Sequence, residues 1–373
     1  MESQADVRAS DTLREGFELA LCGPAEREEQ ARLFNRCFKK SVDAAALAWR
    51  YDGNPVGPAV SLLARPQGAE GVSGYACSPR RAVSHGDEAT LAVVGETGDV
   101  MTDPDWRKRG IFSRLDREAM GETARLGWPL VFGLPNRRSA HIFLELGWES
   151  IGTLRPWTLV LDASPGGREL RAREGRLRGL FAPLAARRAR AARRRLGDAG
   201  RGLEARALER FPAEVEALSR RIERRFAFMV RRDAAWLDWR FLRAPSRLHR
   251  AIGLFERSGD LAGYALVQVP RPGERLGYLV DVLAPSEEAL AAALAAGLDA
   301  LEREGAALVQ ATAIDGSWWR GVLARSAFQP SRPASALSVI LHLHQPRHAL
   351  AAAARPAAGW YFTDGDRDDE TMG

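Results

Sequence analysis

Hydrophobic and polar residues alternate with two different periods along the first 160 positions. Alternation over residues 17–21 predicts a strand, and apolar residues at helical spacing predict helices over residues 25–38 and 43–51. Short β-type runs come next, and we expect them to pair as antiparallel strands; they cover residues 59–64, 74–77 and 90–94. A strand–helix unit follows at 99–115. A strand at 130–136, a helix at 139–146 and a last strand at 153–161 then complete a mixed α/β lobe.

The segment from Asp99 to Leu115 changes from strand to helix within a few residues. Asp103-Pro104 ends the strand, and apolar residues resume at helical spacing from Ile111. A basic turn, Arg107-Lys108-Arg109-Gly110, therefore precedes a helix N-terminus, where free N–H groups and the helix dipole attract anions. The sequence predicts an anion-binding site at this turn.

At these residues the chain resembles the GNAT acyltransferase superfamily. The family's acyl-CoA motif (Arg or Gln, two residues, Gly, one residue, Gly or Ala) is matched by Arg107 and Gly110, with Phe112 in place of the last small residue. The strand ending at Asn136, the helix after it and the Leu146-Gly-Trp148 turn are similar to the family's next elements. The alternative is a generic strand–turn–helix unit with a solvated basic cap, and the order of several motifs favours the family.

The resemblance implies an acyl-CoA site in the N-terminal lobe. Backbone groups of the central strand would hold the pantetheine and thioester, the basic turn would hold the pyrophosphate, and Asn136 would face the cofactor unless it only caps a helix. The residues implied in cofactor binding are Val100, Met101, Thr102, Arg107, Lys108, Arg109, Gly110, Ile111, Phe112, Asn136, Ser139 and Phe143.

Acid–base groups are less clearly marked. Glu96 and Asp99 lie where the family often places its general base, and both also suit a structural role. Phe143 stands where the family often has a tyrosine that protonates the leaving thiolate, and a phenyl ring cannot donate a proton. His141 is nearby, although a histidine on a helix surface is the commoner interpretation.

Residues 163–205 are rich in arginine and predict a basic helical linker with one apolar stripe around Pro183. We favour a solvated, packed face over a nucleic-acid or membrane-surface patch. Aromatic residues do not interleave with the arginines, which disfavours base stacking, whereas Phe181 and the nearby leucines suit a weak membrane-surface contact.

From residue 206 the chain repeats its own pattern. The Trp-Arg pair at 49–50 recurs at 239–240, Gly-Tyr-Ala at 74–76 recurs at 263–265, and Asp99-Val recurs at Asp281-Val. This order indicates a duplicated domain. The second copy has Ser286-Glu-Glu288 where the first has the basic turn, and carboxylates there would repel a pyrophosphate, so we expect it to bind no CoA. We interpret the Trp-Arg pairs as architectural, with an inter-lobe substrate clamp as the alternative.

Composition changes this picture little. The net charge of +6 rests almost entirely on arginine, which we discount as evidence for a nucleic-acid partner. Three cysteines lack metal-type spacing and suggest buried thiols in a reducing cytoplasm. The N-terminus does not read as a signal peptide, and no apolar run is long enough to span a membrane. Acidic residues around Gly365 lack the full EF-hand spacing, so we expect no metal and an acidic tail lying on basic surface.

We therefore predict an α/β protein of two tandem GNAT-like lobes, each a mostly antiparallel sheet flanked by helices. The expected ranges are a catalytic N-terminal lobe at 1–162 with a loose lead-in, the linker at 163–205, a degenerate C-terminal lobe at 206–345 and an aromatic-then-acidic tail at 346–373. We expect a cytoplasmic monomer that transfers an acetyl group from acetyl-CoA, or another acyl-CoA, to an amine acceptor between the lobes. The rival hypotheses are a non-catalytic acyl-CoA sensor or scaffold and a FemAB-like aminoacyl transferase.

Overall fold

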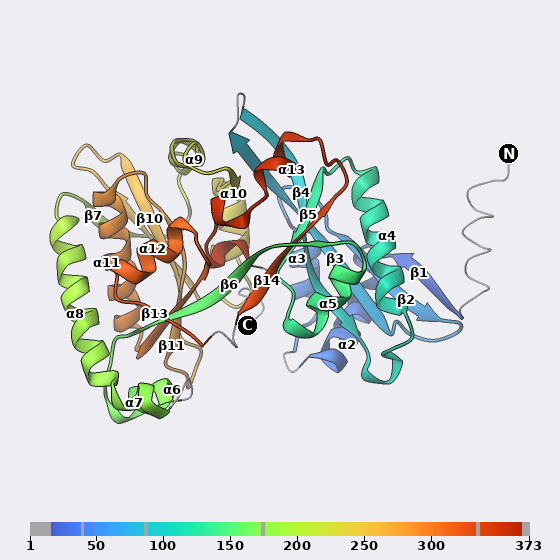
Figure 1. Cartoon of the computed structure of the whole chain (residues 1–373), viewed down its shortest axis with the longest axis horizontal. Coiled ribbons are helices and arrows are strands. Elements are labelled where there is room, and N and C mark those ends of the chain that lie inside the picture. Colours follow the sequence, from blue (N-terminus) through green and yellow to red (C-terminus); the bar gives the residue numbers. More distant parts are fainter. Residues whose placement is uncertain (1–15, 39–40, 86–88, 173–175, 333–335, 368–373) are drawn as a thin grey trace.

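The protein consists of two α/β lobes that lie side by side, with two long strands crossing between them (Figure 1). The computed structural model describes residues 16–38, 41–85, 89–172, 176–332 and 336–367. The expected lead-in at 1–14 and the last acidic residues of the tail lie outside the described residues. Within the described residues, no helix combines the length and apolar character needed to cross a bilayer.

The first lobe follows the predicted order of elements closely. Its strands are β1 (Phe17–Leu21), β2 (Val60–Pro66), β3 (Ser73–His85), β4 (Ala89–Thr102) and β5 (Leu130–Gly133). Its helices are α2 (Arg27–Cys37), α3 (Ala44–Tyr51), α4 (Ile111–Arg125) and α5 (Arg137–Glu145). The segments expected as separate strands at 90–94 and 99–102 form one strand, β4, because its long hairpin partner β3 hydrogen-bonds it along its length.

Helix α4 is held against the sheet by a buried carboxylate. Asp116 Oδ1 accepts hydrogen bonds from the Tyr75 hydroxyl at 2.8 Å and from the Trp148 indole N–H at 3.2 Å. Burial raises the pKa of Asp116 above its ordinary value, against the lowering effect of these two donors. The helix that begins at the basic turn is therefore fixed to both β3 and the loop before β6.

The lobes exchange strands, which the sequence pattern did not predict. Strand β6 (Glu149–Val160), expected to close the first lobe, pairs along Leu154–Val160 with β12 (Leu308–Ile314) of the second lobe. In return β14 (Leu337–Leu343), from the end of the second repeat, pairs with β5 of the first lobe. The strands of both repeats form one continuous sheet in which β14 and β6 lie between β5 and β12, so the chain crosses between the two halves of the sheet on both sides of the boundary expected at 162.

The second lobe repeats the layout of the first. Its remaining strands are β7 (Glu204–Leu208), β9 (His249–Phe255), β10 (Leu261–Gln268), β11 (Leu276–Leu283), β12 (Leu308–Ile314) and the short β13 (Gln329–Pro330). Its helices are α9 (Val215–Glu223), α10 (Ala234–Leu237), α11 (Glu287–Arg303), α12 (Trp318–Arg325) and α13 (Ala349–Ala353). The short strands β8 (Phe228–Val230) and β15 (Trp360–Tyr361) pair with each other, and β8 also pairs with β3 of the first lobe.

The basic segment forms three helices that belong to the second lobe. These are α6 (Pro165–Ala172), α7 (Arg176–Leu180) and α8 (Ala182–Ala199), and α8 lies along the outside of α11 (Figure 1). An alanine face of α8 is buried, and its members are Ala182, Ala186, Ala189 and Ala192. The expected helical linker is present, but it covers one face of a lobe instead of spanning the gap between two.

The duplicated tryptophans join the lobes. The indole N–H of Trp49 donates to the backbone carbonyl of Trp239 at 3.2 Å, and the indole N–H of Trp239 donates to the carbonyl of Trp49 at 3.0 Å. Such reciprocal bonding is the signature of a two-fold interface, here within one chain. The tryptophans thus hold the interface between the repeats, which is an architectural role.

A buried ionic network also crosses between the lobes. Arg232 pairs with Asp281 at 3.0 Å and with Asp366 at 2.6 Å, and Asp366 lies 3.5 Å from Arg80 of β3. Arg80 in turn pairs with Glu96 of β4. The described part of the tail therefore enters the interior between the repeats, which corrects the expectation that its acidic residues lie on basic surface.

Candidate active site

The candidate site begins where strands β4 and β5 separate. These parallel strands are hydrogen-bonded from Gly95–Val131 to Thr97–Gly133, and the register of β4 against β3 then shifts between Gly74 and Ala76. Asp99 lies in this irregularity with a φ of +48°, in the left-handed region. The bulge directs β4 away from β5 and opens a wedge lined by Val100 and Asn136.

The basic turn forms one wall of a large cavity beside this wedge. The cavity has a volume of about 660 Å³ and is lined by Met101, Thr102 and the whole turn from Trp106 to Ser113. Gly110 is the N-cap of α4 with a φ of +73°, and it offers no side-chain acceptor to the first N–H groups of the helix. The helix N-terminus therefore opens onto a cavity of ligand size.

The cationic side chains of the basic turn are exposed, and both arginines donate hydrogen bonds to backbone carbonyls just before the turn. The Arg107 Nε–H donates to the Thr102 carbonyl at 3.2 Å, and Arg109 donates to the Asp105 carbonyl while its guanidinium lies 4.7 Å from the Trp106 ring centroid. Lys108 adopts a positive φ of +64°. The turn is thus preorganised with three positive charges around the mouth of the cavity.

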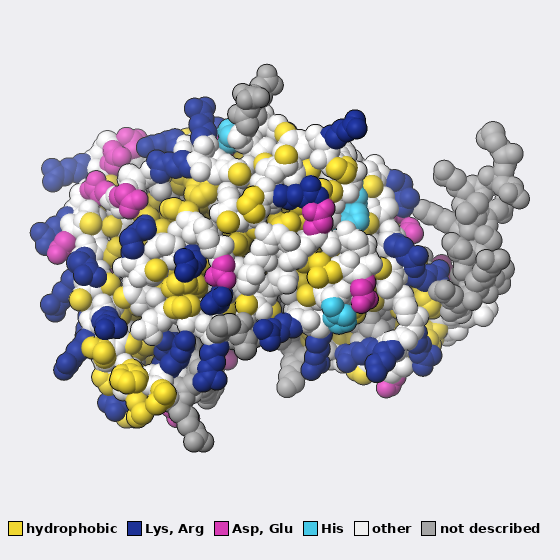
Figure 2. All heavy atoms as spheres, viewed as in Figure 1, with side chains coloured by type: hydrophobic (Ala, Val, Ile, Leu, Met, Phe, Trp, Pro, Cys, Tyr) yellow, Lys and Arg dark blue, Asp and Glu magenta, His cyan; other side chains and the backbone are white. Residues whose placement is uncertain are grey.

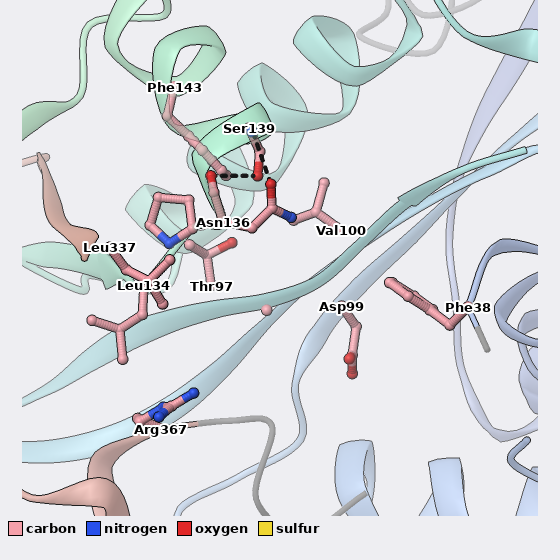
Figure 3. A pocket seen from close by; sticks show the side chains of 12 residues that line it. Phe38, Thr97, Asp99, Val100, Leu134, Asn136, Ser139, Phe143, Leu337 and Arg367 are labelled. Atoms are coloured by element: carbon pink, nitrogen blue, oxygen red, sulfur yellow. Dashed lines mark hydrogen bonds between the residues drawn. The ribbon is translucent and has the colours of Figure 1, made fainter. Parts of the chain in front are cut away.

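A second cavity of about 320 Å³ continues from the first toward the junction of the lobes. Phe38, Val100, Asn136 and Ser139 line both cavities. Figure 3 shows Asn136, Ser139 and Phe143 on one side of it, Asp99 and Phe38 on another, and Arg367 reaching it from the C-terminal segment. The two cavities therefore form one passage from the helix N-terminus to the space between the repeats.

Asp99 is the only carboxylate among the described residues that line either cavity. Its Oδ2 accepts a bond from the Tyr51 hydroxyl at 2.7 Å and lies 2.9 Å from Arg50 Nε. Both donors come from the end of α3, so the helix fixes the position and direction of the carboxylate. An oriented carboxylate at this point can bind a cationic group or accept a proton through a short relay.

Glu96, which the sequence suggested as a base, lies outside both cavities. It is buried, pairs with Arg80 and contributes to neither cavity. The reason is the alternation of the strand, which directs Glu96 into the junction between the lobes, where the buried arginine meets it.

The other predicted residues of the site lie around the passage. Asn136 caps α5, because its Oδ1 accepts bonds from Arg138 N at 2.9 Å and Ser139 N at 3.1 Å. Phe112 and Phe143 pack edge to face with centroids 5.1 Å apart. Asn136 thus caps helix α5, which was the alternative to its facing a cofactor, and it also lines both cavities.

Cys37 and His141 also border the larger cavity, but neither is well placed to act as a nucleophile or an acid. Cys37 lines the larger cavity, but burial raises the pKa of its thiol to about 11, so it is not a thiolate at neutral pH. His141 lies on the exposed side of α5 at the rim of the same cavity. All three cysteines are free, with Cys77 buried and the other two partly so, as expected.

The equivalent wedge of the second lobe is filled by the chain itself. Strands β11 and β12 pair as far as Tyr278–Gln310, and beyond that point Asp364 accepts a hydrogen bond from the Thr312 backbone N–H. Arg367 donates to the Thr312 hydroxyl at 3.0 Å, and the Tyr361 hydroxyl donates to the Val282 carbonyl. The C-terminal segment therefore occupies, in the second repeat, the place that remains open in the first.

Sequence reasoning missed several residues that line the passage or hold its carboxylate in place. Arg50 and Tyr51 could have been found, because the Trp-Arg-aromatic pattern occurs in both repeats. Leu337 and Arg367 had no local signal, since they reach the cavity only through the strand exchange and the docked tail.

Comparisons with known proteins agree with this geometry. Residues 21–151 match the family model described as an acetyltransferase (GNAT) domain. A probable N-acyltransferase from Enterococcus faecalis is similar in structure, with 13% identity over 88% of this chain and 73% of that one and a TM-score of 0.60. A GCN5-related N-acetyltransferase from Kribbella flavida has 15% identity over 90% and 72%, with a TM-score of 0.58.

Another similar structure is itself a tandem protein. It is a tandem GNAT protein from the clavulanic acid biosynthesis pathway, with 15% identity over 88% of this chain and 98% of that one and a TM-score of 0.54. At such identities the likeness establishes the fold and its two-lobed arrangement. A search of curated proteins gives no significant match.

Proposed function

We propose that this chain, whose residues 21–151 match an acetyltransferase (GNAT) domain, is a GNAT-type acyltransferase. Its first lobe transfers an acetyl group from acetyl-CoA to an amine acceptor bound between the lobes. The observation that carries the proposal is the continuous passage: an anion-binding helix N-terminus at one end and an oriented carboxylate, Asp99, at the other. A donor with a pyrophosphate and a long neutral arm suits the first part, and a cationic acceptor suits the second.

The donor is held from its charged end inward. The N–H groups after Gly110 bind the pyrophosphate, and Arg107, Lys108 and Arg109 add positive charge at the rim. The pantetheine arm lies in the wedge beside Val100, Met101 and Thr102, where it takes the place of a strand partner. These roles follow the sequence-based assignment and stay predictions until a complex is measured.

The chemical step joins the amine nitrogen to the thioester carbonyl carbon and breaks the carbon–sulfur bond. Asp99 attracts the acceptor as an ammonium and receives its proton, directly or through water, so that the neutral amine attacks. The thiolate leaves and takes the second proton of the attacking nitrogen, which is cationic after the attack, directly or relayed through the hydroxyl of Ser139, which lines both cavities. Phe143 supplies shape and no proton.

A non-catalytic acyl-CoA sensor is the second candidate, and one observation favours it. Phe143 packs at the centre of an aromatic cluster with Tyr75, Phe112 and Trp148, and the Tyr75 hydroxyl is committed to Asp116. A sensor would bind CoA with the same determinants yet show no turnover with any amine, so product formation separates the two functions.

The experiment that tests CoA binding is Gly110→Asp. Aspartate adds a negative charge beside the pyrophosphate, and loss of two charge-assisted bonds lowers CoA affinity by at least about a hundredfold. Isothermal calorimetry of acetyl-CoA binding and thermal melting are measured together on each variant.

Gly127→Asp is the matched control. Gly127 has a φ of +77° against +73° for Gly110, and an added Cβ meets nothing within 4 Å at either position. Both variants therefore carry the same backbone strain and the same new charge, and only Gly110 faces the cavity. Equal CoA affinity in the two folded variants would refute the acyl-CoA site and the acyltransferase proposal with it.

A further inference from the structure

An apolar patch lies on the outside of the second lobe, at the turn between α7 and α8. It consists of Leu177, Leu180, Phe181 and Leu184, exposed by 68%, 74%, 62% and 46%. The first three are the most exposed large hydrophobic side chains in the described chain. Figure 2 shows hydrophobic side chains gathered at this corner of the molecule, at the lower left, where Figure 1 places α7. Exposed apolar side chains gathered in this way mark an interaction site.

The fold holds this apolar patch firmly. Arg178 donates to the Pro330 carbonyl at 2.9 Å, and buried Arg171 donates to Gln329 Oε1 at 2.7 Å, which ties α6 and α7 to β13. Gly179 packs so closely on α6 that a Cβ would lie 3.0 Å from the Arg168 carbonyl oxygen. The four apolar side chains are therefore presented outward by a fixed turn and contribute little to the core.

The outer surface of α8 continues the patch as a row of arginines, which we term the arginine face: Arg187, Arg188, Arg194 and Arg195. All four are exposed, and none has an ion-pair partner within the described residues. Arg193, on the side toward α11, is the one that pairs with Asp299 at 2.5 Å and Glu302 at 2.7 Å. From residue 176 to 197 the sequence has eight arginines and no acidic residue.

The patch and the arginine face meet in a groove. This groove, of about 300 Å³, is lined by Leu177, Phe181, Leu184 and Arg188 together with Arg178 and Gln329. Apolar side chains and a guanidinium thus lie side by side on one outward surface. A lipid offers the same combination, an acyl chain next to a phosphate.

We propose that the α7–α8 surface docks the protein on an anionic membrane. The apolar patch enters the interface between headgroups and acyl chains, and the arginine face lies along the phosphates. A second copy of the chain would bring two arginine faces together, which like charge opposes. Nucleic acid would leave three exposed leucines without a partner, and only one aromatic ring, Phe181, is available to stack on a base.

Docking in this orientation leaves the active site open. Figure 1 shows α7 and α8 at the far end of the second lobe, whereas α4 and α5, which border the cofactor cavity, lie in the first lobe. The inference therefore stands independently of the acyl transfer proposed above, and its test needs no turnover.

The test is sedimentation of the full-length protein with lipid vesicles. We expect binding to vesicles of equal parts phosphatidylcholine and phosphatidylglycerol, little binding to pure phosphatidylcholine, and weakening by added salt. Replacing the arginine face with glutamine (R187Q, R188Q, R194Q and R195Q together) lowers vesicle affinity by roughly a hundredfold or more, because each arginine near the surface contributes about fivefold. The triple variant L177Q, L180Q and F181Q lowers it by roughly tenfold or more, because buried apolar area is lost.

Two control variants match these changes elsewhere on the surface. Arg220, Arg221, Arg224 and Arg225 form an exposed basic group at the end of α9. Their replacement by glutamine removes the same charge away from the patch. Leu21, Leu91 and Leu126, exposed by 52%, 50% and 58%, are the matched leucines. Both control variants are expected to keep vesicle binding near that of the unchanged protein, and melting curves verify that every variant is folded.

Several results would overturn the proposal. Equal binding to neutral and anionic vesicles would remove the role of charge, and unchanged binding by the triple apolar variant would remove the role of the patch. Binding of a structured RNA without vesicle binding would assign the surface to nucleic acid. A dimer in sedimentation equilibrium that the triple variant dissociates would assign it to a second copy.

Discussion

At the scale of single residues, Asp99 carries the local irregularity on which the site depends. A non-glycine residue with a φ of +48° is costly for the backbone, and here it lies at the shift of register between β3 and β4. Arg50 and Tyr51 hold its carboxylate in place. The same distortion that opens the wedge for a cofactor therefore also aims a charged group at the neighbouring cavity.

The two carboxylates considered as bases are separated by one pair of variants. Asp99→Asn keeps the size of the side chain and removes its charge, so kcat is expected to fall by about a hundredfold or more while acetyl-CoA affinity is kept. Glu96→Gln leaves Arg80 short of a partner and is expected to lower stability by up to about 3 kcal/mol with kcat of the folded protein unchanged. Steady-state kinetics and urea unfolding measure both. A greater loss of kcat in Glu96→Gln would contradict the assignment.

Sequence reasoning found Asp99 but not the reason for its role. Helical spacing and the repeat marked Trp49-Arg50 as a notable pair, yet the contact from Arg50 to Asp99 joins residues 49 positions apart and depends on how α3 packs on the sheet. Local patterns do not contain such a distance. The conformation of Gly110, by contrast, could be predicted from the local sequence. Its positive φ is a property of the turn, and the neighbouring residues in the sequence determine that turn.

At the scale of elements, the two repeats differ in what enters the wedge between their central strands. In the first repeat the space beside β4 and β5 is a cavity, and in the second Asp364 bonds the Thr312 N–H between β11 and β12. The second helix also begins with Ser286 as its cap and two glutamates in its first turn. Two independent features thus oppose a cofactor there, one electrostatic and one steric.

The steric feature predicts that removing the two negative charges alone will not restore a second site. Neutralising both carboxylates with Glu287→Gln and Glu288→Gln removes the repulsion but leaves the docked tail in place. We expect calorimetry to give one acetyl-CoA per chain for this variant, as for the unchanged protein. Two sites of comparable affinity would mean that the glutamates alone had closed the second wedge. The Gly110→Asp background serves as the control, because any binding that persists in it belongs to the second lobe.

At the scale of the whole molecule, exchange of β6 and β14 and the ionic network make the lobes interdependent. Arg232 is completely buried, and pairing with Asp281 and Asp366 raises its pKa further above its ordinary value despite the opposing effect of burial. Asp366 reaches this network from the end of the chain and also approaches Arg80 of the first lobe. A few C-terminal residues therefore connect the two lobes.

Removal of Asp366 is expected to destabilise the entire chain. Asp366→Ala leaves a buried guanidinium with one counter-charge in place of two and lowers the free energy of unfolding by about 3 to 5 kcal/mol, in a single transition for both lobes. Asp315→Ala is the control, because Asp315 pairs with Arg155 at 2.9 Å but is 36% exposed, and such pairs contribute less than about 1 kcal/mol. Urea denaturation followed by circular dichroism measures both. Equal effects would show that burial of the network is not what stabilises the junction.

The sequence by itself determined the elements, their order, the duplication and the basic turn before helix α4. Each of these depends on residues close together in the chain: alternation for strands, helical spacing for helices, and a glycine before a helix for the turn. The tertiary structure alone decided which lobe each closing strand joins, where the tail lies and which carboxylate faces the cavity. Those outcomes depend on pairing between residues more than fifty positions apart, such as Ile340 with Gly133 and Asp364 with the wedge at Thr312. A strand pattern shows that a segment will pair but contains nothing about the partner, because the free N–H and C=O groups of β5 and β12 are equally able to receive it.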